Sequence, residues 1–183
     1  MENQQPENHE EKKCNCNDNC ICGDSKEKRK PLEKVMIVCS KSGIDSVYAA
    51  LILANGARSE GIDVDMFFTF FGLDVITKKR MDHLKVAIAG NPGMHMPEMV
   101  GVFPGMEAFA THMMRKEMDK LDIPPVAEFL DIIKAAGGKI FGCKLAAEMF
   151  HLTREDLWEE VDDILTVGQF YERATERSQI IFI

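Results

Sequence analysis

The chain has 183 residues and carries 22 basic against 30 acidic side chains, which gives a net charge of −8. Nucleic-acid-binding proteins neutralise phosphates with clustered lysines and arginines. We take the only basic cluster to be the one in the N-terminal segment, at Lys26, Lys28, Arg29 and Lys30. Composition therefore argues against nucleic-acid binding and favours a soluble protein with small or cationic partners.

Two segments differ in composition. Residues 1–33 are almost all polar or charged apart from their cysteines, and from Lys34 onward the sequence is apolar and periodic. This contrast predicts a tail over 1–33, disordered without metal, and one domain over 34–183 that is large enough to bury its own core. The acidic N-terminus shows no secretory signal, so we expect a cytoplasmic protein whose six cysteines are reduced.

The stretch 86–106 has a single charge, Glu98, and resembles a membrane span in composition only. Prolines and glycines interrupt it throughout, and a spanning helix must satisfy its backbone hydrogen bonds over about 20 apolar residues. We therefore predict an apolar lid or an oligomer contact, and no transmembrane span.

A strand, a helix and a second strand open the predicted domain. Residues 34–40 form a β-branched run, and apolar residues at 47, 50, 51 and 54 have helical spacing. Gly61 stands where a helix C-cap is expected, and the apolar run 63–71 follows it. A strand–helix–strand unit with short links predicts parallel strands joined by a right-handed crossover.

The remaining elements continue this alternation. We expect helices at 73–80, 106–121, 126–133 and 144–150, with a strand at 139–142 that runs into Cys143. Thr153 and Asp156 have the spacing of a helix N-cap and its capping-box partner. A strand at 163–167, a helix at 169–177 and a strand at 179–183 end the chain. The order predicts an α/β three-layer sandwich with a mostly parallel sheet of about five strands.

Cys143 is the first candidate for a functional residue. Reactive groups on an open parallel sheet lie at the carboxyl ends of the strands, where the next helices begin. Cys143 occupies such a junction, and Gly142 before it would let backbone approach closely. The positive end of the helix dipole favours the thiolate, which can accept a sulfur atom and become a persulfide. The alternative is that Cys143 is a small buried hydrophobic residue, as free cysteines often are.

The run IFGCKLAAEMF, followed by LTVGQFYERATERSQIIFI, resembles the DsrE/DsrF-like family of sulfur-relay proteins. The segments KVMIVCSKSGID, AALILANGAR and GIDVDMFFTFFG also resemble it, so the similarity covers about residues 34–183. It is closest to a branch often labelled peroxiredoxin family protein, in which the Met-, Gly- and Pro-rich middle segment recurs. A peroxidatic cysteine needs a nearby proline and threonine, and the surroundings of Cys143 do not supply that pattern.

The resemblance implies a flavodoxin-like α/β fold, homo-oligomers and no required cofactor. It also implies a cysteine that carries sulfane sulfur or thiosulfate in transfer to or from rhodanese- or TusA-like partners. Only Cys143 matches the position of the carrier cysteine.

Cys39 ends the first predicted strand and so lies at the same edge of the sheet. It is either a second or resolving thiol that meets Cys143, or a buried strand cysteine. The turn that follows, Ser40, Lys41, Ser42 and Gly43, is a candidate cradle for a small anion such as thiosulfate. This turn lacks the full phosphate-loop pattern.

Four cysteines of the tail have the spacing C-x-C-x3-C-x-C and could together hold one Zn²⁺, although standard sites use C-x2-C pairs. They are Cys14, Cys16, Cys20 and Cys22. Methionines and histidines between 94 and 114 suit copper(I), but the helical spacing of 106, 109, 110, 113 and 114 indicates a core stripe. We prefer a Met-rich apolar lid that covers Cys143 or docks a neighbouring subunit.

Three functions remain. The first is a sulfur carrier or sulfurtransferase-like protein that acts through Cys143, either with turnover or as a stoichiometric relay. The second is a non-catalytic oligomer that binds a small anion or a nucleotide at Ser40–Gly43. The third is a metal-handling protein that acts through the cysteine tail.

Overall fold

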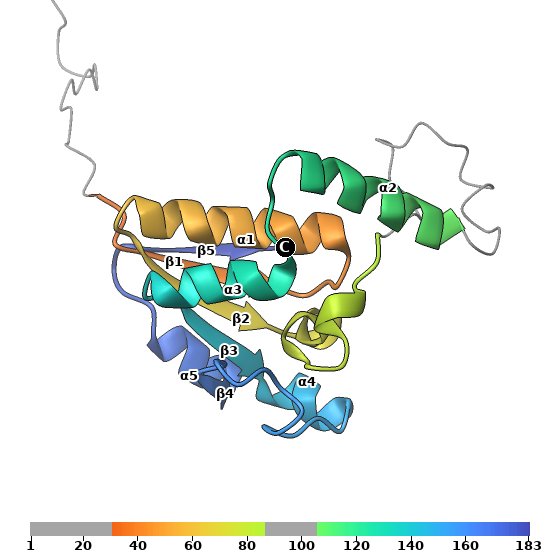
Figure 1. Ribbon diagram of the computed structural model, residues 1–183. Helices are drawn as coiled ribbons and strands as arrows, with labels where there is room; N and C mark the ends of the chain where they lie inside the picture. The colour runs from red at the N-terminus through yellow and green to blue at the C-terminus, as the bar shows by residue number, and fades with distance from the viewer. Residues whose placement is uncertain (1–30, 87–105) are drawn as a thin grey trace, which may run out of the picture. The chain divides into compact units, whose positions relative to one another are not determined.

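A five-stranded sheet with helices on both faces forms the folded part of the chain, as the computed structural model shows (Figure 1). The structure describes residues 31–86 and 106–183. The four tail cysteines and residues 87–105 of the predicted lid lie outside the described residues. Within the described ranges, no helix combines the length and apolar character needed to cross a bilayer.

The helices and strands follow one another in the predicted order. They are β1 (Lys34–Cys39), α1 (Ile44–Ser59), β2 (Asp63–Phe68), the 3₁₀ segments η1 (Phe70–Ile76) and η2 (Met81–His83), α2 (Met106–Lys120), α3 (Val126–Ala135), β3 (Lys139–Cys143), α4 (Lys144–Met149), β4 (Asp163–Leu165), α5 (Val167–Glu172) and β5 (Ser178–Phe182).

All five strands are parallel, in the order β4-β3-β2-β1-β5. Cys39 is in register with Phe68, and Phe68 is in register with Gly142, so β1, β2 and β3 end together at one edge of the sheet. This arrangement confirms the predicted α/β sandwich with a parallel sheet of five strands.

Two local predictions were wrong. In place of the α-helix expected at 73–80, the 3₁₀ segment η1 ends at Ile76 and a turn follows it, before η2 begins at Met81. Thr153 does donate to Asp156 Oδ2 through its backbone N–H (2.9 Å) and its hydroxyl (2.8 Å), but these residues form a turn without a helix. The capping box lies instead at Thr166 and Gln169, where α5 begins.

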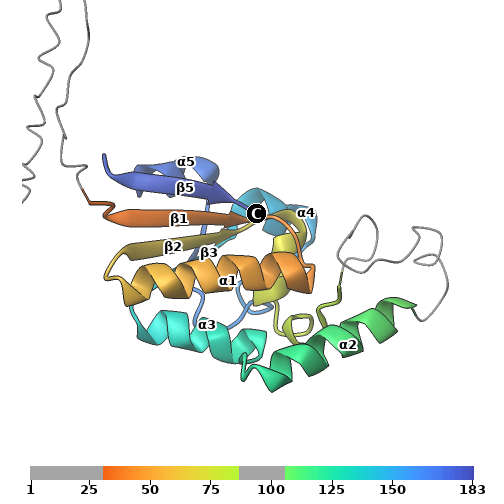
Figure 2. The same ribbon diagram turned by 90° about the horizontal axis from the view of Figure 1, so that it is seen from above.

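The two faces of the sheet carry different helices (Figures 1 and 2). Phe170 of α5 stacks on Phe67 of β2 with ring centroids 4.5 Å apart, so Phe67 marks the face that α5 covers. Helices α1 and α3 pack on the opposite face. Because side chains alternate along a strand, Ile37, Met66 and Ile140 belong to the α1–α3 face, where all three are fully buried.

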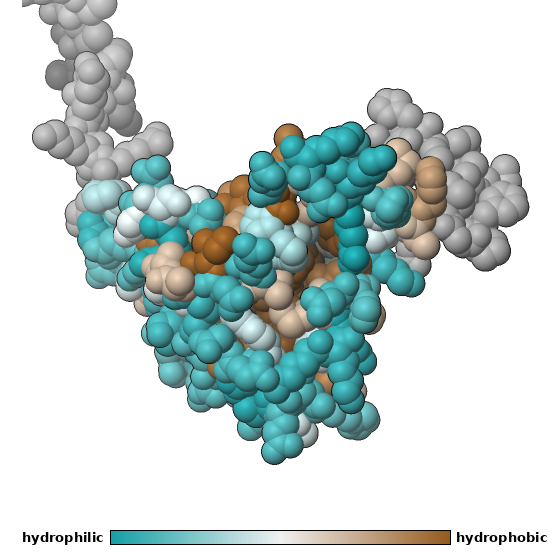
Figure 3. All heavy atoms as spheres, viewed as in Figure 1, coloured by the Kyte–Doolittle hydropathy of each residue, from teal (hydrophilic) through white to brown (hydrophobic). Residues whose placement is uncertain are grey.

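Helix α5 leaves the β5 side of its face uncovered. Ile180 and Phe182 lie in register with Met36 and Val38, and Phe182 is 71% exposed. Apolar residues are also exposed on several helices, and Figure 3 shows apolar patches that interrupt a mostly hydrophilic surface. These residues are Ile52 and Leu53 of α1, Phe109 and Met113 of α2, Ile132 of α3, and Val167 and Tyr171 of α5. The stripe predicted over 106–114 is therefore only partly core, since Ala110 is buried and Phe109 is not.

A buried carboxylate joins β2 to β1 and to α5. Asp65 is 1% exposed and accepts hydrogen bonds from Lys34 Nζ at 3.1 Å and from Arg173 Nε at 2.7 Å. The guanidinium of Arg173 also lies 4.4 Å from the ring centroid of Phe141. A buried charge must be paired, so this cluster fixes where α5 lies on the sheet.

We expect Asp65→Asn to lower the free energy of unfolding by about 2–4 kcal/mol. This predicted loss of stability is smaller than the loss caused by breaking a fully buried ion pair, because Lys34 and Arg173 keep some contact with water. Urea unfolding followed by circular dichroism measures the change. Asp63→Asn is the matched control, since Asp63 pairs with Arg58 at 2.7 Å but its side chain is 71% exposed, and it should cost less than about 1 kcal/mol. Equal effects of the two substitutions would contradict the role given to Asp65.

Candidate functional site at the carboxyl edge of the sheet

Cys143 is the last residue of β3 and the N-cap of α4, in extended backbone conformation with φ −77° and ψ 123°. Its side chain is 4% exposed and is not oxidised to a disulfide. The structure thus places Cys143 at the predicted strand–helix junction. Helix α4 is short, with 6 residues, so the local backbone offers Cys143 only a weak helix dipole.

Apolar side chains surround the end of β3. Segment η1 packs against both β3 and α4. A Cβ added at Gly142 would meet Leu73 Cδ2 and Leu157 Cδ1, each at 3.5 Å, which is ordinary van der Waals contact. The expectation that backbone approaches Gly142 closely is therefore wrong, because the nearest neighbours of this Cβ are side chains at ordinary contact distance.

Cys39 is the more deeply enclosed of the two thiols that the structure describes. It is 0% exposed and its Sγ lies 3.5 Å from the backbone oxygen of Lys41. Burial raises the pKa of the Cys39 thiol to about 11. At neutral pH this thiol is protonated and is therefore a poor nucleophile.

The two thiols lie on opposite faces of the sheet. Gly142 shares the row of Cys39 and Phe68, and the residue after Gly142 faces the other way because side chains alternate. Cys143 is instead in register with Leu165, on the α5 face. Strand β2 also separates their strands. The thiols thus share an edge of the sheet without contacting each other in this structure.

The end of β1 is closed by η1. The backbone N–H of Thr69 donates to the carbonyl oxygen of Cys39 at 3.0 Å, and the N–H of Gly72 donates to that of Ser40 at 3.2 Å. A Cβ at position 72 would collide with the carbonyl oxygen of Cys39. Glycine at 72 is therefore what allows the chain after β2 to cross the end of β1.

The residues of the predicted anion loop, Ser40 to Gly43, do not all face the same surroundings. The backbone N–H and the hydroxyl of Ser40 both donate to the carbonyl oxygen of Ile183, at 2.8 and 3.0 Å. Ser42 and Gly43 instead line an open pocket of about 350 Å³ with residues from η1, η2 and the segments beside them. The other lining residues are Asp74, Lys79, Arg80, His83, Leu84, Lys85 and Val86.

The basic residues of this pocket form a second cluster of positive side chains besides the one at 26–30. The run Lys78, Lys79 and Arg80, followed by His83 and Lys85, is a second basic cluster, inside the folded domain. The number of basic residues in this short stretch would have been enough to detect the cluster from the sequence. The sequence could not show that the cluster lies near Ser42, because this proximity depends on how the chain folds after β2.

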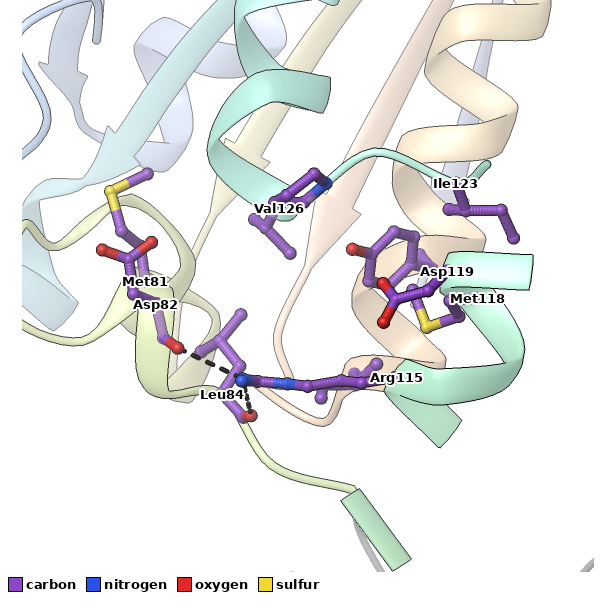
Figure 4. A pocket seen from close by; sticks show the side chains of 11 residues that line it. Met81, Asp82, Leu84, Arg115, Met118, Asp119, Ile123 and Val126 are labelled. Carbon is purple, nitrogen blue, oxygen red and sulfur yellow. Dashed lines mark hydrogen bonds between the residues drawn. The ribbon is translucent and has the colours of Figure 1, made fainter. Parts of the chain in front are cut away.

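A second pocket, of about 260 Å³, lies between α1, α2, η2 and the start of α3 (Figure 4). Arg115 reaches from α2 and donates to the backbone oxygens of Asp82 and Leu84, each at 3.1 Å. The Tyr48 hydroxyl donates to Pro124 O at 2.9 Å, and burial raises the pKa of Tyr48. Arg115 therefore joins α2 to η2 across a pocket that is lined largely by apolar side chains.

No group of three or more candidate ligand side chains that could hold a metal ion occurs among the residues the structure describes. The tail cysteines Cys14, Cys16, Cys20 and Cys22 lie outside that part of the chain.

Fold and site together define an α/β protein with a thiol at the carboxyl edge of a parallel sheet. The model of the DsrE/DsrF/DrsH-like family matches residues 31–182, and the chain belongs to this family. It is 30% identical over 159 residues to the sulfur carrier protein DsrE2 of Allochromatium vinosum, an alignment that covers 82% of this chain and 98% of that protein.

Two further proteins are similar. The protein YrkE of Bacillus subtilis, described as uncharacterized, is 24% identical over 159 residues, which cover 82% of this chain and 97% of YrkE. The structure of MTH1491 from Methanobacterium thermoautotrophicum, a protein of unknown function, superposes with a TM-score of 0.51 at 12% identity. That match covers 82% of this chain and 99% of MTH1491, and it shows similarity of fold alone.

We predict that Gly72→Ala destabilises the protein by about 1–3 kcal/mol, because the added methyl group overpacks against rigid backbone. Gly56→Ala is the control. Gly56 lies inside α1, with no atom within 4 Å of an added Cβ, so alanine there should stabilise by about 0.5–1 kcal/mol. Thermal and urea unfolding measure both changes. A neutral Gly72→Ala would contradict the close approach of η1 to β1.

Cys39 should react with alkylating agents far more slowly at neutral pH than an exposed thiol does, because it is buried and protonated. Alkylation of Cys39 by iodoacetamide should still accelerate about tenfold per pH unit above pH 9, because burial holds its pKa at about 11. An ordinary thiol, with a pKa of about 8.5, has levelled off by then. Peptide mass spectrometry over time measures the rate, and the same chain in urea is the control. A plateau near pH 9 in the folded protein would contradict the elevated pKa.

Proposed function

We propose that this protein is a sulfur carrier whose acceptor is Cys143. The observation that carries this proposal is the position of Cys143 at the β3–α4 junction, on the edge of the sheet where loops meet. Cys39, the other described thiol, is fully buried and has a raised pKa. Membership of the family and similarity to a sulfur carrier protein along nearly its whole length support the same function.

The chemistry needs no cofactor. The Cys143 thiolate attacks the outer sulfur of thiosulfate, the S–S bond breaks, and sulfite leaves with the bonding electron pair, so that Cys143 becomes a persulfide. A partner thiolate then attacks the terminal sulfur of this persulfide and restores the Cys143 thiolate. With tetrathionate, the same attack releases thiosulfate and leaves a thiosulfate group bound to the cysteine.

Burial of Cys143 has two consequences for this chemistry. At 4% exposure, a donor reaches the sulfur only after local movement of the surrounding loops. Once loaded, a persulfide in an apolar environment is shielded from water and from unselective reductants. A carrier that hands sulfur to one partner requires such shielding.

The proposal extends to partners and compartment. Rhodanese- or TusA-like proteins are the expected donors and acceptors, and the exposed apolar residues on α5 and β5 fit contact with another subunit in a homo-oligomer. Reduced thiols fit the cytoplasm. A zinc ion at Cys14, Cys16, Cys20 and Cys22 would be structural in this scheme, since sulfur transfer is assigned to Cys143.

The reduced full-length protein, incubated with thiosulfate, tetrathionate or a polysulfide, should gain sulfur on the Cys143 peptide. The adduct should disappear with a reductant, and with thiosulfate an equal amount of sulfite should be released. Peptide mass spectrometry and a sulfite assay measure the two products.

Cys39→Ser should load and release normally, whereas Cys143→Ser should release no sulfite. The tail cysteines provide an internal comparison, because their peptides appear in the same digest. Sulfite release that persists in Cys143→Ser would reject Cys143 as the acceptor. A Cys143 that acquires no sulfur from any of the three donors would favour the non-catalytic binding function instead.

A further inference from the structure

The pocket between α1, α2, η2 and the start of α3 has no cysteine among its lining residues (Figure 4). Its apolar wall consists of buried side chains from three different parts of the chain, namely Ile44, Met81, Leu84 and Val126. Its volume of about 260 Å³ exceeds that of an apolar cavity of about 150 Å³ that holds one benzene molecule. The pocket therefore has room for a single ring with a short substituent.

Hydrogen bonds between separate elements hold the walls of this pocket in place. The Tyr48 hydroxyl of α1 donates to Pro124 O at 2.9 Å, in the segment between α2 and α3. Arg115 of α2 donates to the backbone oxygens of Asp82 and Leu84, each at 3.1 Å. The cavity thus exists before a ligand enters it, and binding would not have to order its walls.

The charged residues that line the pocket are Asp82, Arg115 and Asp119, and all three are exposed at its rim. Neither carboxylate forms an ion pair or a side-chain hydrogen bond within residues 31–86 and 106–183. Figure 4 shows the Asp119 carboxylate turned from α2 toward the rest of the pocket. Two negative charges against one positive charge favour a cationic group over an anionic group at the rim.

The Tyr48 hydroxyl lies between this rim and the apolar interior. Burial raises the pKa of Tyr48, Arg115 opposes the rise, and Asp119 adds to it. Both charged groups are therefore close enough to act on this hydroxyl. Its hydrogen is donated to Pro124 O, so its oxygen remains available as an acceptor for a donor on a ligand. The free acceptors of the pocket thus match a ligand that carries N–H donors.

We propose that this pocket binds a small molecule that combines one apolar ring with one cationic amine. The ring fills the space between Ile44, Leu84 and Val126, and the ammonium group lies at the rim, where it pairs with Asp119. Arg115 keeps its hydrogen bonds to backbone oxygens and holds α2 against η2. Binding forms no covalent bond and does not use a thiol, so the proposal is independent of sulfur transfer.

The test is isothermal titration of the full-length protein, at neutral pH and low ionic strength, with three phenyl compounds of similar size. Phenethylamine is a cation, phenethyl alcohol is neutral and phenylacetate is an anion. We expect saturable binding of phenethylamine with a Kd of about 1 mM or below. It should bind about threefold or more tightly than the alcohol, and phenylacetate should bind most weakly. Added sodium chloride should weaken binding of the amine and leave that of the alcohol unchanged.

Two aspartates supply matched variants with the same change in overall charge. Asp119 lines the pocket, whereas Asp122 lies in the turn after α2 and does not. Asp119→Asn should weaken binding of phenethylamine about threefold to fivefold and leave binding of phenethyl alcohol unchanged. Asp122→Asn should change neither. Asparagine suits the left-handed backbone at position 122, where φ is 51°, so this control should fold normally.

Three results would overturn the proposal. Absence of saturable phenethylamine binding would show that the cavity holds no ligand of this class. Binding of the alcohol or of phenylacetate as tight as that of the amine would show that the carboxylates do not determine the charge of the ligand. Equal loss of affinity in Asp119→Asn and Asp122→Asn would show that only the overall charge matters. Sulfur loading of Cys143 should be the same in Asp119→Asn as in the parent protein, so the two proposals are tested separately.

Discussion

The pairing of Asp65 with two cations constrains the rest of the structure. Its carboxylate is buried on the central strand β2, where Lys34 of β1 and Arg173 next to α5 supply the partners that a buried acidic group needs. This requirement holds α5 over β2 and β3, where Phe170 stacks on Phe67. One short helix of 6 residues cannot also cover β5, so the same face ends in exposed apolar side chains. The opposite face is covered by the longer helices α1 and α3.

This asymmetry between faces gives the two thiols different chemistry. Cys39 faces the layer formed by α1 and α3, where complete burial suppresses its thiolate. Cys143 faces the side that α5 covers and leads directly into the six-residue helix α4. The alternation of side chains in a parallel sheet therefore places the two cysteines in different layers of the protein. The position of each cysteine in the predicted strands does not distinguish the two thiols, because each is the last residue of a strand at the same edge of the sheet.

Periodicity in the sequence was sufficient to predict the parallel sheet and the junction at Cys143, because both follow from local patterns of apolar residues. It could not predict what depends on contacts between distant segments. Segment η1 crosses the end of β1 in 3₁₀ conformation. This crossing requires glycine at position 72, beside the carbonyl oxygen of Cys39. The basic pocket likewise joins Ser42 to residues about forty positions later. Thr153 and Asp156 show the limit of local signals, since their hydrogen bonds form without the helix that their spacing predicted.

The proposed sulfur transfer through a thiolate would take place in an acidic chain. Thiosulfate, sulfite and the persulfide are all anions, and a chain with a net charge of −8 repels them at long range. The basic pocket and Cys143 occupy the same edge of the sheet, and η1 touches both, since it packs on β3 and α4 while its Asp74 lines the pocket. Segment η1 is therefore part of the surroundings of both the pocket and the β3–α4 junction.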